Sequence, residues 1–200
     1  MDISLEPGKY VVAVSGGVDS VVLLHMLFQK YGSPVASRQS PEKAGDQGLE
    51  TRDRVQLMVA HFDHGIRPES AQDAKFVEGL AAKYGLSYVS KREELGVDAS
   101  EELARQRRYA FLEFVVSDQA ARAVITAHHK DDVIETAYIN VLRGTSRKGL
   151  SSLRSTEKIV RPLLRVDKQT ILKYAHDQGL QWREDASNSD EKYLRNKIRA

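Results

Sequence analysis

The hexapeptide Ser-Gly-Gly-Val-Asp-Ser at residues 15–20 constrains the fold of this chain more than any other feature. An apolar run at residues 10–14 precedes it and predicts a buried strand, and residues 18–31 follow with the pattern of a helix that ends at Gly32. Two adjacent glycines predict a tight turn, because a residue without Cβ tolerates positive φ. The first N–H groups of a helix attract anions. The hexapeptide therefore predicts a phosphate-binding turn.

The side chains of this turn indicate what kind of phosphate site it forms. A carboxylate beside phosphate oxygens repels them unless a cation lies between, so Asp19 predicts Mg²⁺. Neither a Walker A pattern nor Gly-x-Gly-x-x-Gly occurs in the sequence. The simpler alternative is a glycine turn whose aspartate only caps the helix. The residues expected to contact the phosphates are Ser15, Gly16, Gly17, Val18, Asp19 and Ser20.

Strands and helices alternate along the rest of the chain. Strands are expected at residues 10–14, 55–61, 86–90, 123–127 and 159–160, and helices at residues 18–31, 70–84, 98–117, 131–142 and 167–178. This alternation predicts an α/β fold, a Rossmann-like parallel sheet of about five strands with helices on both faces. Such sheets bind ligands beyond the carboxyl ends of their strands.

Composition limits the chemistry and the organisation of the chain. Cysteine is absent, which excludes disulfides, thiolate metal sites and cysteine nucleophiles. No membrane-spanning run or signal pattern occurs, so a cytoplasmic location is expected.

Two segments of the chain differ from the rest in composition. Residues 33–54 are rich in Ser, Pro, Gly and charged residues and predict a flexible surface insertion. Residues 143–200 contain 14 Lys and Arg and 7 Asp and Glu. This excess of positive charge predicts either a solvated face or a binding surface for a polyanion such as RNA.

Carboxylates and histidines follow the predicted strands. Asp131 or Asp132 shares a helix face with Glu135, and with Asp19 they could surround one cation. Asp132 is the expected Mg²⁺ ligand beside Asp19, although one aspartate of the pair would serve as a helix cap. A zinc or iron hydrolase site is a rival interpretation, and histidines that only pack or hydrogen-bond are a simpler one. The rival site would use His61, Asp63, His64, His128, His129 and Asp132.

Two levels of family resemblance follow from these motifs. The hexapeptide resembles the PP-loop of the adenine nucleotide α-hydrolase superfamily, whose members split ATP between its α and β phosphates. Five further blocks, at residues 61–67, 104–109, 128–136, 142–150 and 185–199, resemble the signature of the tRNA(Ile)-lysidine synthetase family. The resemblance implies a ligase that adenylates C2 of the wobble cytidine of tRNA(Ile) with a CAU anticodon and then joins free L-lysine to it. ATP and Mg²⁺ are the implied cofactors.

The resemblance also implies roles for individual residues. Asp19 and Asp132 would hold Mg²⁺, and Glu135 and Asp131 would bind lysine or accept its proton. The implied catalytic set is Asp19, Asp132, Glu135, Arg195 and Arg199. Arg105 is implied to contact ATP, and the implied contacts to lysine or tRNA are Asp131, Glu135, Arg108, Arg143, Arg147 and Lys148. A homodimer is one assembly state that the sequence allows.

Domain limits and rival functions follow from the same reasoning. Residues 1–180 are expected to form the catalytic domain, and residues 181–200 a basic segment that stops before the tRNA-binding regions of the family. PP-loop enzymes that thiolate tRNA need cysteines, which this chain lacks. The remaining alternatives are another PP-loop pyrophosphatase acting on a tRNA base or a small molecule, and a non-catalytic module that binds ATP or RNA.

Overall fold

The structure is a computed structural model that describes residues 3–32, 54–65, 70–96, 99–142, 144 and 153–184. The expected insertion at residues 33–54 lies outside this part of the chain except for Arg54, as does the C-terminal segment beyond Glu184.

The core of the fold is a five-stranded sheet in which every strand pair is parallel. Its strands are β1 (Gly8–Ala13), β2 (Val55–Asp63), β3 (Ser87–Arg92), β4 (Ala123–Ile125) and β5 (Ile159–Val160). They lie in the order β3-β2-β1-β4-β5, so the chain runs outward from β1 first in one direction and then in the other. The predicted α/β class and strand number are confirmed. The site is expected where this direction reverses, at the carboxyl ends of β1 and its neighbours.

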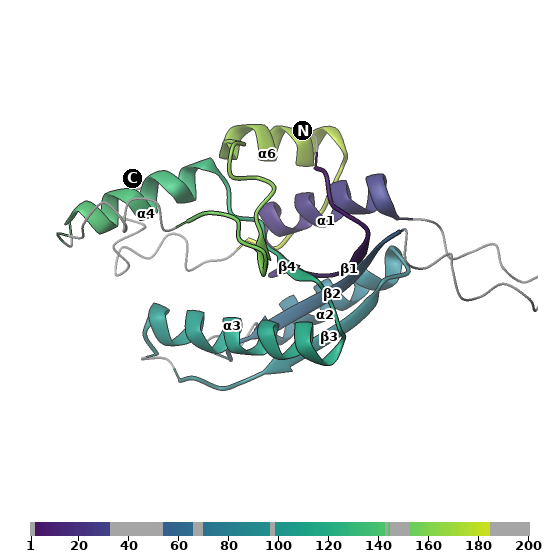
Figure 1. Ribbon diagram of the computed structural model, residues 1–200, viewed down its shortest axis with the longest axis horizontal. Coiled ribbons are helices and arrows are strands. Elements are labelled where there is room, and N and C mark those ends of the chain that lie inside the picture. Colours follow the sequence, from purple (N-terminus) through teal and green to yellow (C-terminus); the bar gives the residue numbers. More distant parts are fainter. Residues whose placement is uncertain are drawn as a thin grey trace, which may run out of the picture.

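Helices cover both faces of the sheet, as the sequence predicts. They are α1 (Val18–Tyr31), α2 (Ser70–Lys83), α3 (Glu101–Asp118), α4 (Lys130–Leu142) and α6 (Lys168–Asp177). Successive residues of β1 point to opposite faces of the sheet, so the strand can pack against helices on both sides. Val12 packs in one cluster with residues of α1, α2 and α6, and Val11 packs in another with residues of α3. Figure 1 shows α1 and α6 on one side of the sheet and α3 on the other.

Caps determine where two of the helices begin. The Ser100 hydroxyl accepts from the Leu103 N–H at 3.2 Å, so α3 begins three residues after the expected start at Asp98. The Asp167 carboxylate accepts from the Thr170 N–H at 2.8 Å and caps α6 in the same way. In the described part of the chain, no helix is both long and apolar enough to cross a membrane.

The interface between α1 and α6 contains a buried histidine. His25 Nδ1 lies 3.1 Å from the Tyr174 hydroxyl, and its Nε2 lies 3.3 Å from the Gln29 amide. The ring also packs against Tyr84 at a centroid distance of 6.3 Å. Burial lowers the pKa of His25, and the positive charge of Lys83 lowers this pKa further. The fold therefore disfavours the charged form of this side chain.

Stability should consequently fall in mild acid. Above the ordinary histidine pKa of about 6.5, His25 is neutral in both the folded and the unfolded chain. As pH falls from there toward the lowered pKa, the unfolded chain binds a proton that the folded chain does not, so the free energy of unfolding decreases. Urea unfolding at pH 7.5 and pH 5.5 would measure the difference. It should shrink in His25→Gln, and an equal difference in both proteins would contradict the assignment.

Candidate active site

Ser20, the last residue of the PP-loop, forms hydrogen bonds to the backbone of the same loop. The Ser20 hydroxyl accepts from the N–H groups of Ser15 and Gly16, both at 3.2 Å, and donates to the Gly17 carbonyl at 2.9 Å. Gly16 has a φ of +97°, in the region that favours glycine. Gly17 is the N-cap of α1, so the first N–H groups of this helix face away from its body. The turn is thus shaped as an anion site, and the Ser20 hydroxyl serves its internal geometry.

A cavity of about 240 Å³ opens at the carboxyl ends of β1, β2 and β4. Its position agrees with the rule for open parallel sheets. Ser15, Asp19 and Ser20 line it from the PP-loop, and Asp132 lines it from α4. Further walls come from the end of β2, the start of α2 and the middle of α3, including His61, Phe62, Asp63, His64, Ser70, Asp73, Arg108, Tyr109 and Leu112. The structure therefore brings the predicted phosphate turn and the predicted metal ligands to one cavity.

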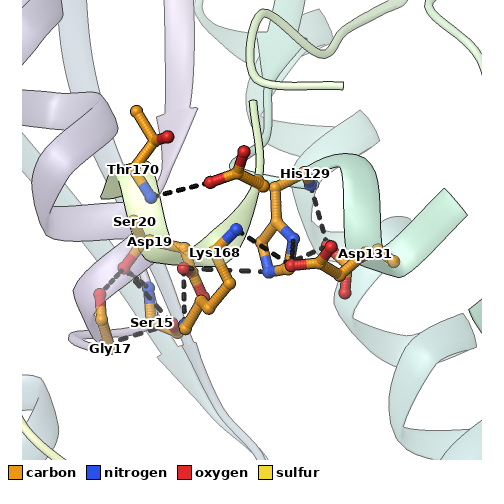
Figure 2. A network of polar contacts seen from close by, with 10 residues as sticks. Ser15, Gly17, Asp19, Ser20, His129, Asp131, Lys168 and Thr170 are labelled. Atoms are coloured by element: carbon orange, nitrogen blue, oxygen red, sulfur yellow. Dashed lines mark hydrogen bonds and ion pairs between the residues drawn. The ribbon is translucent and has the colours of Figure 1, made fainter. Parts of the chain in front are cut away.

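Figure 2 shows Asp19, His129 and Lys168 close together beside the PP-loop. Lys168 Nζ contacts both oxygens of Asp19, at 2.6 and 2.8 Å. His129 Nε2 lies 3.8 Å from Asp19 Oδ1 and 3.7 Å from Asp132 Oδ2. Because one ring nitrogen is near both carboxylates, Asp19 and Asp132 belong to a single site.

Main-chain hydrogen bonds hold Lys168 in this position. Its N–H donates to Asp131 Oδ2 at 2.9 Å, and the Lys130 N–H donates to the Val166 carbonyl at 2.9 Å. The segment between β5 and α6 is thereby fastened to the start of α4. Asp132 also accepts from the His129 N–H at 2.9 Å, so both aspartates of the pair order the backbone at this corner.

The donor set fits Mg²⁺ better than a transition metal. Mg²⁺ is usually held by one or two carboxylates together with substrate phosphates, and Asp19 and Asp132 supply the carboxylates beside the phosphate turn. The Lys168 ammonium already lies on Asp19, which shows that this carboxylate accepts a cation. No group of three or more ligating side chains suited to a metal ion occurs among the described residues. A complete protein cage is therefore absent from that part of the chain.

Two histidines of the rival zinc or iron interpretation have hydrogen-bonding partners of their own. His61 Nδ1 lies 2.8 Å from the Val14 carbonyl, and His128 Nδ1 lies 2.8 Å from the Thr126 hydroxyl. Burial alone would raise the pKa of Asp63, but the Gly65 N–H at 2.9 Å and the Arg92 guanidinium at 3.2 Å hold this pKa below its ordinary value. Hydrogen bonds and an ion pair account for His61, His128 and Asp63 without a metal.

The other predicted residues are distributed unevenly. Arg108 lines the cavity from α3, whereas the guanidinium of Arg105 packs over the Tyr109 ring at 5.0 Å and does not line it. Glu135 is buried on α4. The predicted contacts Arg143, Arg147, Lys148, Arg195 and Arg199 lie outside the described residues.

Lys168 and Arg183 are the main residues of this region that sequence reasoning misses. Lys168 is the first residue of α6, the helix that follows β5. The rule that segments after parallel strands carry the chemistry could have drawn attention to it, because Asp132 follows β4 in the same way. Arg183 has no such signal, since it follows a helix.

Comparison with known proteins agrees with this geometry. The sequence profile described as the PP-loop domain matches residues 3–200. A tRNA(Ile)-lysidine synthase of Geobacter sulfurreducens is 38% identical over 96% of this chain and 39% of that protein. A tRNA(Ile)-lysidine synthase of Thermus thermophilus is 38% identical over 94% of this chain and 34% of that protein. One of Persephonella marina is 32% identical over 97% of this chain and 40% of that protein. The chain spans about two fifths of the length of these relatives.

Solved structures support the fold alone. The U34-tRNA thiolase NcsA from Methanococcus maripaludis superposes with a TM-score of 0.68 at 19% identity, covering 90% of this chain and 60% of that one. The NH3-dependent NAD synthetase from Campylobacter jejuni superposes with a TM-score of 0.50 at 15% identity, covering 96% of this chain and 70% of that one. The sequence profile, the parallel sheet and the phosphate turn agree, and this chain belongs to the PP-loop domain family.

Proposed function

We propose that the chain catalyses the ATP-dependent ligation of lysine to C2 of the wobble cytidine, C34, of tRNA(Ile) with a CAU anticodon. The observation that carries the proposal is the 32 to 38% identity to tRNA(Ile)-lysidine synthases over nearly the whole chain. The cavity supports it, because the phosphate turn and two carboxylates line one space at the strand ends. The products are lysidine, AMP and diphosphate.

In the proposed first step, the C2 oxygen of cytidine attacks the α phosphate of ATP and pyrophosphate leaves. The N–H groups at the start of α1 bind the leaving phosphates, since they have no partners within the helix. The Lys168 ammonium, held at 2.6 Å from Asp19, adds a positive charge where negative charge develops. Mg²⁺ held by Asp19 and Asp132 would neutralise phosphate charge when bound.

In the proposed second step, the neutral ε-amine of lysine attacks C2 and AMP is expelled. The amine must give up a proton, so a carboxylate near the cavity is required. Glu135 and Asp131 are proposed for this task and for binding the cationic end of lysine. Glu135 is buried one turn along α4 from Asp131, which is itself 40% exposed. Replacing each separately would show which carboxylate affects the KM for lysine.

Further parts of the proposal concern residues outside the described structure. Arg195 and Arg199 are proposed to contact ATP phosphates, and Arg143, Arg147 and Lys148 are proposed to contact the tRNA backbone.

The proposal also covers the domain limits, the compartment and the assembly state. Residues 1–180 would form the catalytic domain. Because tRNA is the proposed acceptor, the cytoplasm is the expected compartment. A homodimer stays a prediction that analytical ultracentrifugation would test.

Incorporation of radiolabelled lysine into transcripts would test the proposed function. Wild type should label tRNA(Ile) with a CAU anticodon in the presence of ATP, and should not label the same transcript with a GAU anticodon. Asp132→Ala should reduce labelling by about a hundredfold or more, because one of two carboxylates at the phosphates is lost. ATP binding without any AMP release would instead support a non-catalytic module. Equal labelling by both proteins would remove Asp132 from the mechanism.

A further inference from the structure

The segment that follows α6 returns to the PP-loop. Gly179, with a φ of +58°, turns the chain after α6. The Leu180 N–H then donates to the Ala175 carbonyl at 2.9 Å. Leu180 and Trp182 pack against the main hydrophobic cluster, and the Trp182 ring meets His176 edge-on at a centroid distance of 5.4 Å. These contacts fix the segment on the body of the protein just before Arg183.

Arg183 joins the PP-loop to α2 through main chain and side chain together. Its N–H donates to the Gly16 carbonyl at 3.0 Å. Its Nε donates to Asp73 Oδ1 at 3.0 Å, and a terminal nitrogen donates to Gln72 Oε1 at 3.2 Å. Gln72 and Asp73 lie in the first turn of α2. One residue thus bridges the glycine turn and a helix that is more than fifty positions away in the sequence.

The contact to Gly16 controls the direction of a phosphate-binding group. The Gly16 carbonyl and the Gly17 N–H belong to one planar trans peptide unit, so they point in opposite directions. By holding the carbonyl, Arg183 directs the Gly17 N–H the other way, where it lies 3.4 Å from the Ser15 hydroxyl on the cavity wall. Because Gly16 has no side chain and a φ of +97°, this peptide would otherwise rotate easily.

The side-chain contact has an electrostatic consequence. Asp73 lines the cavity and is 16% exposed, so its carboxylate faces the space that ATP would enter. An uncompensated carboxylate there would repel the phosphates. The guanidinium of Arg183 offsets this charge from outside the cavity. Arg183 therefore orders the phosphate turn and reduces the repulsion of ATP.

We propose that Arg183 is a positioning residue for ATP, acting through the Gly16–Gly17 peptide and through Asp73. This inference rests on the proposed use of ATP by this cavity. Its test by ATP binding makes no use of the lysine or tRNA steps. The substrate class concerned is a nucleoside triphosphate bound by its phosphates at the start of α1.

Calorimetric titration with ATP and Mg²⁺, without lysine or tRNA, would test the proposal. Arg183→Ala keeps the main-chain N–H that bonds the Gly16 carbonyl but loses the side-chain anchor on α2 and leaves the charge of Asp73 uncompensated, so it should raise the Kd for ATP about tenfold. Adding Asp73→Asn should recover much of the affinity, because the exposed charge is then removed. In a separate measurement of pyrophosphate exchange with ATP and tRNA, Arg183→Ala should raise the KM for ATP and leave kcat nearly unchanged. Arg183→Lys, which keeps the charge, should lie between Arg183→Ala and wild type.

Arg122→Ala is the matched control, because Arg122 forms an exposed ion pair with Glu6 near the start of β1 and does not line the cavity. It should leave the Kd for ATP unchanged. A Kd in Arg183→Ala within twofold of wild type would overturn the proposal, as would failure of Asp73→Asn to restore affinity. If Arg183→Ala does not fold, Arg183→Lys and Asp73→Asn give the same comparison. Wild type that binds ATP but forms no lysidine would overturn only the proposed function.

Discussion

Asp19→Asn should reduce pyrophosphate exchange, measured with ATP and tRNA, by about a hundredfold to a thousandfold. The substitution keeps the size of the side chain but removes the charge that contacts Lys168 at 2.6 and 2.8 Å and that lies in the same site as Asp132. An amide cannot neutralise the cation or hold Mg²⁺ as a carboxylate does. Loss of electrostatic stabilisation at a transferring phosphoryl group has effects of this size.

Thermal stability should change little in the same variant. The side chains of Asp19 and Lys168 are 28% and 37% exposed, and ion pairs at such positions contribute about 0–1 kcal/mol. Asp177→Asn is the matched control, because Asp177 also pairs with a lysine, Lys173, at 3.0 Å on the exposed side of α6. The control should retain full exchange. Wild-type exchange by Asp19→Asn would exclude Asp19 from the first step.

Lys168→Ala should separate cation binding from catalysis. The ammonium of Lys168 occupies both oxygens of Asp19 in the free protein, so any other cation must compete with it. Without it, Mg²⁺ should bind about fivefold more tightly in the absence of nucleotide, since Coulomb repulsion and competition are both removed. The kcat of pyrophosphate exchange should nevertheless fall about a hundredfold, because the charge beside the leaving phosphates is lost.

Calorimetry with Mg²⁺ alone and pyrophosphate exchange with tRNA would measure the two effects. Lys173→Ala provides the control, because it breaks the corresponding exposed pair with Asp177 on the same helix. Unchanged kcat combined with tighter Mg²⁺ binding would mean that Lys168 only holds Asp19 in place. Weaker Mg²⁺ binding would contradict the proposed competition for Asp19.

Local sequence determines most of the fold, and this part was predictable. The limits of α1 and of β5 agree with the prediction at both ends, because Gly17 and Gly32 border α1 and short apolar runs mark the strands. The start of α3 is displaced because two residues could cap it. Asp98 and Ser100 are both good N-caps, and Ser100 makes the bond to the Leu103 N–H.

Contacts between distant segments were beyond sequence reasoning. The rule for parallel strand ends brought Asp19 and Asp132 to one site correctly. It could not pair Lys168 with Asp19 or Arg183 with Asp73, because these contacts depend on how α6 and the segment after it dock on the sheet. Neither lysine nor arginine shows a local pattern that distinguishes such a contact from an ordinary exposed charge.

The contact between Lys168 and Asp19 also concerns the order of folding. It joins residues separated by 149 positions, so the entropy of closing a long loop must be overcome before it forms. Contacts of high sequence separation slow folding and are completed after local ones. During synthesis, the PP-loop emerges long before α6 does. A nascent chain would therefore hold a PP-loop that still lacks both the Lys168 contact to Asp19 and the Arg183 contact to Gly16, and it would gain them only after α6 and the segment that follows it have docked.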